Sequence, residues 1–132
     1  MIQKVEHVAL IVNDLDEAIA YYGRLFDFVL RARGTNPTRY MAFMHHPDQP
    51  DFEIELIQDI VPPEQPYAER SIVNHLAFTV RNLDEAIAHY RDRGVEFLSD
   101  APLPAIDGGR TIFFYGPSRE LLQLVERGRK QQ

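Results

Sequence analysis

Apolar residues recur along the chain with two different periods, and the changes of period predict its elements. Residues 5–12 are rich in β-branched and aliphatic side chains, which is typical of a buried strand. From residue 15 onward the large apolar side chains recur every three or four positions, which predicts an amphipathic helix to about Leu25. Asp14 and Glu17 form a variant of the capping box, in which side chains accept hydrogen bonds from free N–H groups at a helix start.

The same order of elements is predicted twice along the chain. After the first helix, three strands separated by turns rich in Gly, Asn and Pro are predicted at residues 28–33, 39–44 and 53–58. A second series then consists of a strand at 74–80, a helix from Leu83 capped by Asn82 and ended by Gly94, and strands at 95–99, 110–115 and 121–126.

An internal repeat accounts for this second series. Residues 7–22 (HVALIVNDLDEAIAYY) and 75–90 (HLAFTVRNLDEAIAHY) are identical at ten of sixteen positions, at a constant offset of 68 from His7 to His75. FEIELI at 52–57 matches ELLQLV at 120–125 at the same offset. A repeat of this length indicates that one supersecondary unit has been duplicated.

The repeat predicts one α+β domain built from two tandem βαβββ modules. The first module covers about residues 1–58 and the second about residues 72–128. Residues 59–71 contain three prolines and are predicted to be a linker, because proline cannot donate a hydrogen bond within a central strand. Residues 101–109 are predicted to be a loop, and residues 128–132 a frayed end.

Composition excludes several classes of function. The 132 residues are 45% hydrophobic and 26% charged, which is typical of a soluble globular domain, and the formal charge of −6 argues against binding to nucleic acid or to an anionic membrane. The absence of cysteine excludes disulfides and thiolate chemistry, and it is typical of a cytoplasmic protein. We expect no signal peptide and no membrane span, because no apolar run approaches roughly 20 residues.

Four polar residues occupy equivalent places in the two modules. They interrupt the apolar first and fourth strands, and a pseudo-twofold pairing of the modules would bring them toward one axis: His7, Glu55, His75 and Gln123. Each histidine shares its strand face with a small residue, Ala9 or Ala77, which leaves space for a ligand. Imidazole, carboxylate and amide oxygen together suit a divalent Zn, Ni, Co, Mn or Fe ion.

Each of these residues also has an ordinary structural interpretation. A single strand histidine is more often a hydrogen-bonded core residue, and a single strand Glu or Gln more often faces solvent. The symmetric placement of all four favours metal binding. Glu53 shares a face with Glu55, and the match to Gln123 favours Glu55 as the ligand. His45 and His46, expected in a loop, and His89, expected at the surface, are not assigned to the site.

These motifs resemble the vicinal oxygen chelate superfamily, the group of glyoxalase I, bleomycin-resistance proteins and extradiol dioxygenases. The resemblance covers residues 5–126 through H-V-A-L-x-V…D-L-x-x-A-x-x-Y-Y, N-H-L-A-F-x-V…L-D-E-A-I and the ending GPSRELLQLVE. It implies a curved, mostly antiparallel sheet around a metal-binding cleft, with ligands from the first and fourth strand of each module. It also implies a small-molecule substrate and a homodimer.

The resemblance implies a metal-dependent lyase or isomerase of glyoxalase type. Such enzymes chelate adjacent oxygens of a substrate and move a proton with a Glu ligand. Gln123 stands where the family usually has Glu and cannot titrate, so Glu55 is expected to be the catalytic base. Glutathione as part of the substrate would require cations at the rim, and the candidates are Arg31, Arg33, Arg39 and Arg110.

Two other functions stay open at this point. His7, His75 and Glu55 form a two-histidine, one-carboxylate set, which fits a ring-cleaving non-haem Fe(II) dioxygenase. A metal-free protein that binds a drug or another small molecule, as bleomycin-resistance members do, is the third possibility. It ranks last, because such a protein has no need of four potential ligands at symmetric places.

Overall fold

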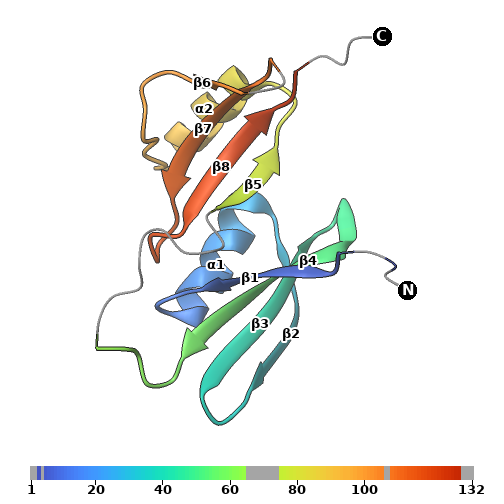
Figure 1. The fold of residues 1–132 in the computed structure, drawn as a ribbon, viewed down its shortest axis with the longest axis vertical. Coiled ribbons are helices and arrows are strands. Elements are labelled where there is room, and N and C mark those ends of the chain that lie inside the picture. The colour runs from blue at the N-terminus through green and yellow to red at the C-terminus, as the bar shows by residue number, and fades with distance from the viewer. Residues whose placement is uncertain (1–2, 4, 65–74, 106–107, 129–132) are drawn as a thin grey trace. The chain divides into compact units, whose positions relative to one another are not determined.

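The computed structural model describes residues 3, 5–64, 75–105 and 108–128. The chain divides into two compact units, residues 1–67 (unit 1) and residues 68–132 (unit 2). Each unit holds a four-stranded mixed sheet and one helix, which confirms the predicted α+β class (Figure 1). Parts of the predicted linker (65–71), of the loop at 101–109 (106–107) and of the C-terminal end (129–132) lie outside the described residues.

Unit 1 has the predicted βαβββ order. Its elements are β1 (His7–Ile11), α1 (Leu15–Phe26), β2 (Val29–Thr35), β3 (Arg39–His46) and β4 (Gln49–Asp59). The sheet order is β1-β4-β3-β2, with β1 parallel to β4 and the other neighbours antiparallel. The first and fourth strands are therefore hydrogen-bonded neighbours, and residues on one face of β1 lie beside residues on the same face of β4.

Unit 2 repeats this topology. Its elements are β5 (Leu76–Thr79), α2 (Leu83–Asp92), β6 (Leu103–Pro104), β7 (Arg110–Tyr115) and β8 (Leu121–Glu126). The sheet order is β5-β8-β7-β6, and β5 runs parallel to β8. The prediction of strands at 110–115 and 121–126 is confirmed at both ends.

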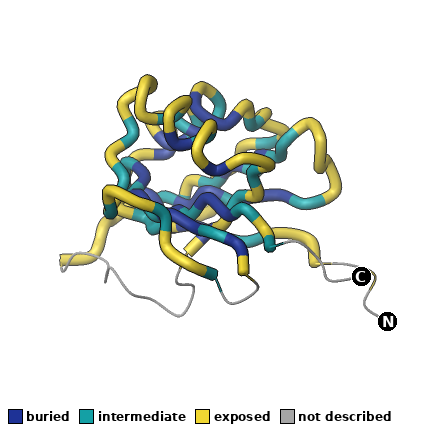
Figure 2. Tube along the Cα trace, turned by 90° about the horizontal axis from the view of Figure 1, so that it is seen from above, coloured by how far each residue is buried: buried dark blue, intermediate teal, exposed yellow. Residues whose placement is uncertain are grey.

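Buried and exposed positions are interspersed along the chain (Figure 2). In each first strand, more buried residues alternate with exposed ones, as the sequence pattern predicts. In β1 and the residue after it, Leu10 and Val12 are buried, whereas His7 and Ala9 are exposed. The helix α1 packs on β3, β4 and β2 of the same sheet, and its Tyr22 is fully enclosed. The polar residues of the first strands thus lie on the sheet face that the helix does not cover.

Several elements differ from the sequence prediction. β4 begins at Gln49 rather than at residue 53, and β6 lies within residues 101–109, which were predicted to be a loop. The strand predicted to end at Met44 continues through His46, because His45 pairs with Glu53 and only a short turn precedes β4. The strand predicted at 95–99 is wrong: within it only Phe97 forms a single bridge, to Phe114. The apolar pattern there reflects the packing of the Phe97 ring, which meets the Phe114 ring edge-on at 5.5 Å.

The helix starts combine a predicted cap with an unpredicted one. Asp14 and Asn82 accept hydrogen bonds from the N–H groups of the residues three positions later, as the capping pattern predicts. In addition, the N–H of Leu15 donates to Gln58 and that of Leu83 donates to Glu126, each at 2.8 Å. Since Gln58 and Glu126 are also 68 residues apart, the last residues of each fourth strand hold the helix start.

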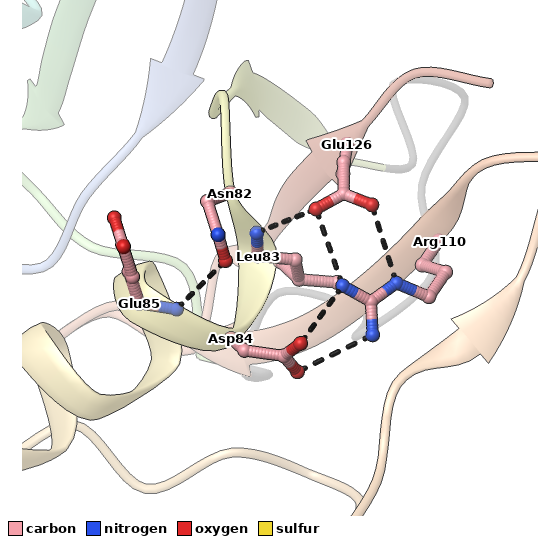
Figure 3. A network of polar contacts seen from close by, with 6 residues as sticks. All are labelled: Asn82, Leu83, Asp84, Glu85, Arg110 and Glu126. Carbon is pink, nitrogen blue, oxygen red and sulfur yellow. Dashed lines mark hydrogen bonds and ion pairs between the residues drawn. The ribbon is translucent and has the colours of Figure 1, made fainter. Parts of the chain in front are cut away.

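Unit 2 extends this cap into a charged network (Figure 3). The Arg110 guanidinium donates to Glu126 at 3.2 Å and to Asp84 in the first turn of α2 at 3.1 Å. Together with the Leu83 N–H, Arg110 holds the pKa of Glu126 below its usual value. Arg110 therefore ties the strands of unit 2 to its helix.

Replacing Gly109 with Ala is expected to destabilise the fold by about 2–3 kcal/mol. A Cβ at this buried position would overlap the backbone oxygen of Glu126 and the neighbouring backbone, which cannot move without breaking the β7–β8 pairing. Urea unfolding measures the loss. Gly34→Ala is the matched control, because a Cβ there meets no atom within 4 Å. An equal loss in both variants would contradict the steric explanation.

Candidate functional site

Unit 1 brings together two of the four predicted ligands. His7 Nε2 lies 3.9 Å from Glu55 Oε1, and the side chains are 35% and 15% exposed, respectively. Register explains this: Glu55 is the direct neighbour of Ala9, so His7 reaches it diagonally across the small alanine side chain. The pair is partly shielded from solvent but open enough to take a ligand.

Two neighbours fix the orientation of the His7 ring. Phe43, the β3 neighbour of Glu55, meets the imidazole edge-on at 5.5 Å between centroids. On the other side, His7 Nδ1 lies 3.2 Å from Glu6 Oε1. When Nδ1–H donates to Glu6, the lone pair of Nε2 is on the side of Glu55. A carboxylate in this position orients many metal-binding histidines.

Unit 2 repeats the arrangement with one chemical change. The His75 ring meets the Phe113 ring edge-on at 5.6 Å, and Phe113 is the β7 neighbour of Gln123. Gln123 is also the direct neighbour of Ala77, as Glu55 is of Ala9. Each unit therefore presents a histidine, an aromatic ring and a fourth-strand side chain with an oxygen atom that could bind a metal, on the face that its helix leaves open.

The sequence repeat does not predict the aromatic residues of this arrangement. Phe43 and Phe113 are 70 residues apart rather than 68, because the turn between the third and fourth strands is longer in unit 1. A search for repeats at a single offset therefore does not align them. The signal that would have found them is an aromatic residue in the third strand of each module.

The structure separates the roles of Glu53 and Glu55. Glu53 is buried and accepts two hydrogen bonds from Arg31, at 2.7 and 2.6 Å. His45 Nδ1 lies 3.5 Å from the same carboxylate. Arg31 holds the pKa of Glu53 below its usual value, and His45 adds to this effect. Glu53 is thus committed to an ion pair, whereas Glu55 faces His7.

Replacing Arg31 with Met is expected to reduce stability at neutral pH and to change it little in acid. Because Arg31 lowers the pKa of Glu53, the unfolded chain binds more protons than the folded chain between the two pKa values. The contribution of the pair is complete above the unfolded-state pKa near 4.5 and is lost as the pH falls through the folded-state pKa. Urea unfolding of the variant and the wild type, at neutral and at acidic pH, measures the loss in the free energy of unfolding under each condition. An equal loss at both would contradict an electrostatic role.

The four arginines considered for anion binding are all in ion pairs with carboxylates. Arg33 contacts Asp16 of α1, and Arg39 contacts Asp59 at the end of β4. Arg110 belongs to the helix-start network of unit 2. Arg31 lies over the Phe43 ring at 5.3 Å, so it borders the open face of unit 1 while it is bound to Glu53.

The three histidines left out of the candidate site have partners outside the His7–Glu55 pair. His45 pairs with Glu53, and its buried Nδ1 makes no hydrogen bond to any described residue. His46, the last residue of β3, lies 3.8 Å from Asp48 of the β3–β4 turn, and His89 lies on the surface of α2 beside Arg93. His45 and His46 are the corrections among them, because both lie in β3 rather than in a loop.

Among residues 3, 5–64, 75–105 and 108–128, no group of three or more His, Asp or Glu side chains is close enough to hold a metal ion. Unit 1 by itself supplies the pair His7 and Glu55, and unit 2 supplies His75 and Gln123. In the part of the chain that the structure describes, no helix has the length and apolar character needed to cross a membrane.

The chain is similar in sequence to uncharacterized proteins of two bacteria. The chain is 28% identical over 127 residues to the uncharacterized protein YwkD of Bacillus subtilis, covering 96% of this chain and 98% of YwkD. It is 28% identical to the uncharacterized protein YaeR of Escherichia coli, covering 95% and 97%.

Solved structures share the fold at lower identity. A glyoxylase/bleomycin resistance protein/dioxygenase domain from Frankia sp. EAN1pec has a TM-score of 0.79 at 22% identity, covering 99% of this chain and 96% of that domain. The fosfomycin resistance protein FosX from Listeria monocytogenes, in complex with Mn(II) and sulfate, has a TM-score of 0.69 at 21% identity, covering 97% and 95%. The family model of the glyoxalase/bleomycin resistance protein/dioxygenase superfamily matches residues 6–114. The chain therefore belongs to this superfamily.

Proposed function

We propose that the protein is a metal-dependent lyase or isomerase of glyoxalase type that acts on a small substrate chelated through adjacent oxygens. In this proposal, His7 and Glu55 of unit 1 and His75 and Gln123 of unit 2 bind one divalent metal ion. The observation that carries it is the convergence of His7 Nε2 and Glu55 Oε1 at 3.9 Å on an open sheet face. The matching placement of His75 and Gln123 supports it.

The donor atoms fit a divalent transition metal. Ligand bonds of about 2.0–2.2 Å place neighbouring ligand atoms about 3.0–3.4 Å apart, so the observed pair needs only a small side-chain rotation to bind one ion. The Mn(II) complex of FosX supports a divalent metal as the class of cofactor. Two neutral imidazoles, one carboxylate and one amide oxygen suit Zn, Ni, Co, Mn or Fe.

The residues of the proposed site have different roles in catalysis. When bound, the ion would supply electrophilic polarisation of the substrate oxygens, which acidifies a neighbouring C–H bond. Glu55 accepts that proton on its carboxylate and returns it to the adjacent carbon, so the proton and electron pair balance within one isomerisation. Gln123 has no titratable group and serves only to bind and orient. One base suffices for a transfer between neighbouring carbons on the same face.

Turnover assays on the metal-loaded protein test this function. The hemithioacetal of methylglyoxal and glutathione is the first substrate, with the lactoyl thioester as the expected product. Oxygen uptake on a catechol by the iron-loaded protein, without hemithioacetal turnover, would replace the proposal with the dioxygenase alternative. Small-molecule binding by a protein that takes up no metal would replace it with the binding alternative.

We further propose that the protein acts in the cytoplasm as a homodimer. The lack of cysteine supports the first assignment, because a reducing compartment needs no disulfides. The four ligands belong either to one chain or to two chains of a dimer. The mass of the metal-loaded species in solution, measured by light scattering, tests whether it is a dimer.

A further inference from the structure

The imidazole of His7 has a carboxylate beside each of its nitrogens, at two different distances. Nδ1 lies 3.2 Å from Glu6 Oε1, whereas Nε2 lies 3.9 Å from Glu55 Oε1. The first distance is that of a hydrogen bond, and the second is too long for one. A neutral imidazole carries one N–H, and of the two nitrogens Nδ1 is the one whose carboxylate is close enough to accept it. The distances therefore place the proton on Nδ1 and the lone pair on Nε2.

The same contacts select one of the two orientations of the ring. Rotating the imidazole by half a turn exchanges Nδ1 with Cδ2 and Nε2 with Cε1, so that carbon atoms would face Glu6 and Glu55. The Phe43 ring, which meets the imidazole at an interplanar angle of 82°, restricts the orientations in between. The hydrogen bond to Glu6 thus determines both the orientation and the tautomer of His7.

Backbone and charge hold the Glu6 carboxylate in this place. Glu6 directly precedes β1, and its carbonyl accepts a hydrogen bond from the Glu53 N–H at 3.0 Å, which ties the residue to β4. The charge of Glu6 also adds to the raised pKa of Arg31, after the larger effect of the hydrogen bond from Arg31 to Glu53. The Glu6 side chain is 69% exposed, so it is held by these interactions rather than by burial.

The carboxylate beside His7 Nδ1 has no counterpart in the sequence of unit 2. At the offset of 68 that aligns the two histidines, Asn74 takes the place of Glu6, just as Gln123 takes the place of Glu55. Unit 1 therefore has carboxylates at both places, and unit 2 has amides. A carboxylate that accepts the outer N–H of a ligating histidine raises the basicity of the ligand nitrogen. This difference makes unit 1 the more strongly donating half of the proposed metal site.

We propose that Glu6 is a positioning residue that holds His7 as the Nδ1–H tautomer and so presents Nε2 to the metal ion. The inference rests on the proposed function, since the ion would be the partner of Nε2. Glu6 acts through His7 and binds neither metal nor substrate. His7 is thereby in its ligating form before the ion arrives.

The variant Glu6→Ala tests the proposal on the full chain after removal of metal. Nitrogen NMR of the histidine rings in alkaline buffer, where imidazole is neutral, distinguishes the two tautomers. We expect Nδ1–H to be the major tautomer of His7 in the wild type and the minor one in the variant. Metal affinity, measured by competition with a chromophoric chelator, is expected to fall about 10–100-fold. The melting temperature should stay the same, because the side chain is mostly exposed.

Glu6→Gln and Glu96→Ala are the matched controls. Gln keeps the shape, and its amide can accept from Nδ1–H or donate to Nδ1, so we expect an intermediate share of the Nδ1–H tautomer and an intermediate metal affinity. Glu96 is an exposed carboxylate outside the proposed site, and removing the same charge there should change neither quantity.

Three results would overturn the proposal. The first is a His7 tautomer that stays the same in Glu6→Ala, and the second is an equal loss of metal affinity in Glu96→Ala. The third is a fall of several degrees in the melting temperature of Glu6→Ala, which would mark a structural role.

The tautomer separates this inference from the proposed function, because it is measured without metal. If the wild type binds no divalent metal and the tautomer of His7 still depends on Glu6, the proposed function fails and the positioning of His7 by Glu6 stands. If His7→Ala weakens metal binding but neither the tautomer nor the metal affinity depends on Glu6, only the inference fails.

Discussion

Replacing Glu55 with Gln is expected to lower turnover by about 10²–10⁴-fold, the usual contribution of a positioned general base. The amide keeps the shape and an oxygen ligand but cannot accept a proton. Because Gln123 is already an amide in unit 2, the variant would give both proposed fourth-strand ligands an amide side chain. The measurement is kcat at full metal occupancy, which separates the loss of the base from any loss of metal.

Glu53→Gln is the matched control for this variant. Glu53 lies on the same face of the same strand, but its carboxylate is bound to Arg31 rather than directed at His7. We expect its turnover to stay within a few-fold of the wild type, while its stability falls at neutral pH and changes little in acid. A Glu55→Gln variant that keeps wild-type turnover would remove Glu55 from the chemistry. A larger loss of turnover in Glu53→Gln than in Glu55→Gln would show that Glu53, rather than Glu55, is the base.

Replacing His7 or His75 with Ala is expected to weaken metal affinity by at least about 10²-fold in each case. Loss of a ligand should exceed the 10–100-fold effect of losing an outer-shell partner. Similar losses are expected because both histidines occupy the same place in their units, each beside a Phe ring. Competition with a chromophoric chelator measures the affinity.

His46→Ala and His89→Ala serve as controls for the two ligand variants. His46 contacts Asp48, two residues later, and His89 contacts Arg93, four residues later, and neither histidine belongs to the proposed ligand set. Their removal should leave metal affinity unchanged. If His7→Ala weakens binding and His75→Ala does not, a site with ligands from both units is contradicted.

Much of the fold could be predicted because its signals are local or repeated. The capped helix starts at Asp14 and Asn82 depend on short-range hydrogen bonds, and both were predicted from spacing. The open face of β1 followed from strict alternation around His7. The length of the β3–β4 hairpin was not predicted correctly. The polar residues His45 and His46 suggest the end of a strand, but their pairing with β4 extends β3 through both residues.

Only those parts of the site that are repeated in the two units could be predicted from the sequence. His7 and Glu55 were found by their repeat, and they do converge. The ion pair of Arg31 with Glu53 was not found, because it depends on a register shift in β2 between Leu30 and Ala32. Such a bulge places Arg31 on the open face and leaves no trace in the apolar pattern.

The left-handed backbone conformation of Arg119, with a φ of 60°, is not predictable from the sequence for a similar reason. The letters GPS predict a turn, but they do not state which of the following residues takes the left-handed conformation. That assignment depends on the hydrogen bonds between Gly116 and Glu120, which close the hairpin. The linker at 59–71 and the roles of the four ligands stay predictions.

Metal content is the most direct test of the central claim that His7, Glu55, His75 and Gln123 bind one divalent ion. Elemental analysis of the purified wild-type protein should find one transition metal ion per chain, which corresponds to one ion for each set of four ligands. The His7→Ala, Glu55→Ala double variant should contain none while it keeps the wild-type circular dichroism spectrum. A wild-type chain without metal after loading, or a double variant that retains the full amount, would contradict the claim.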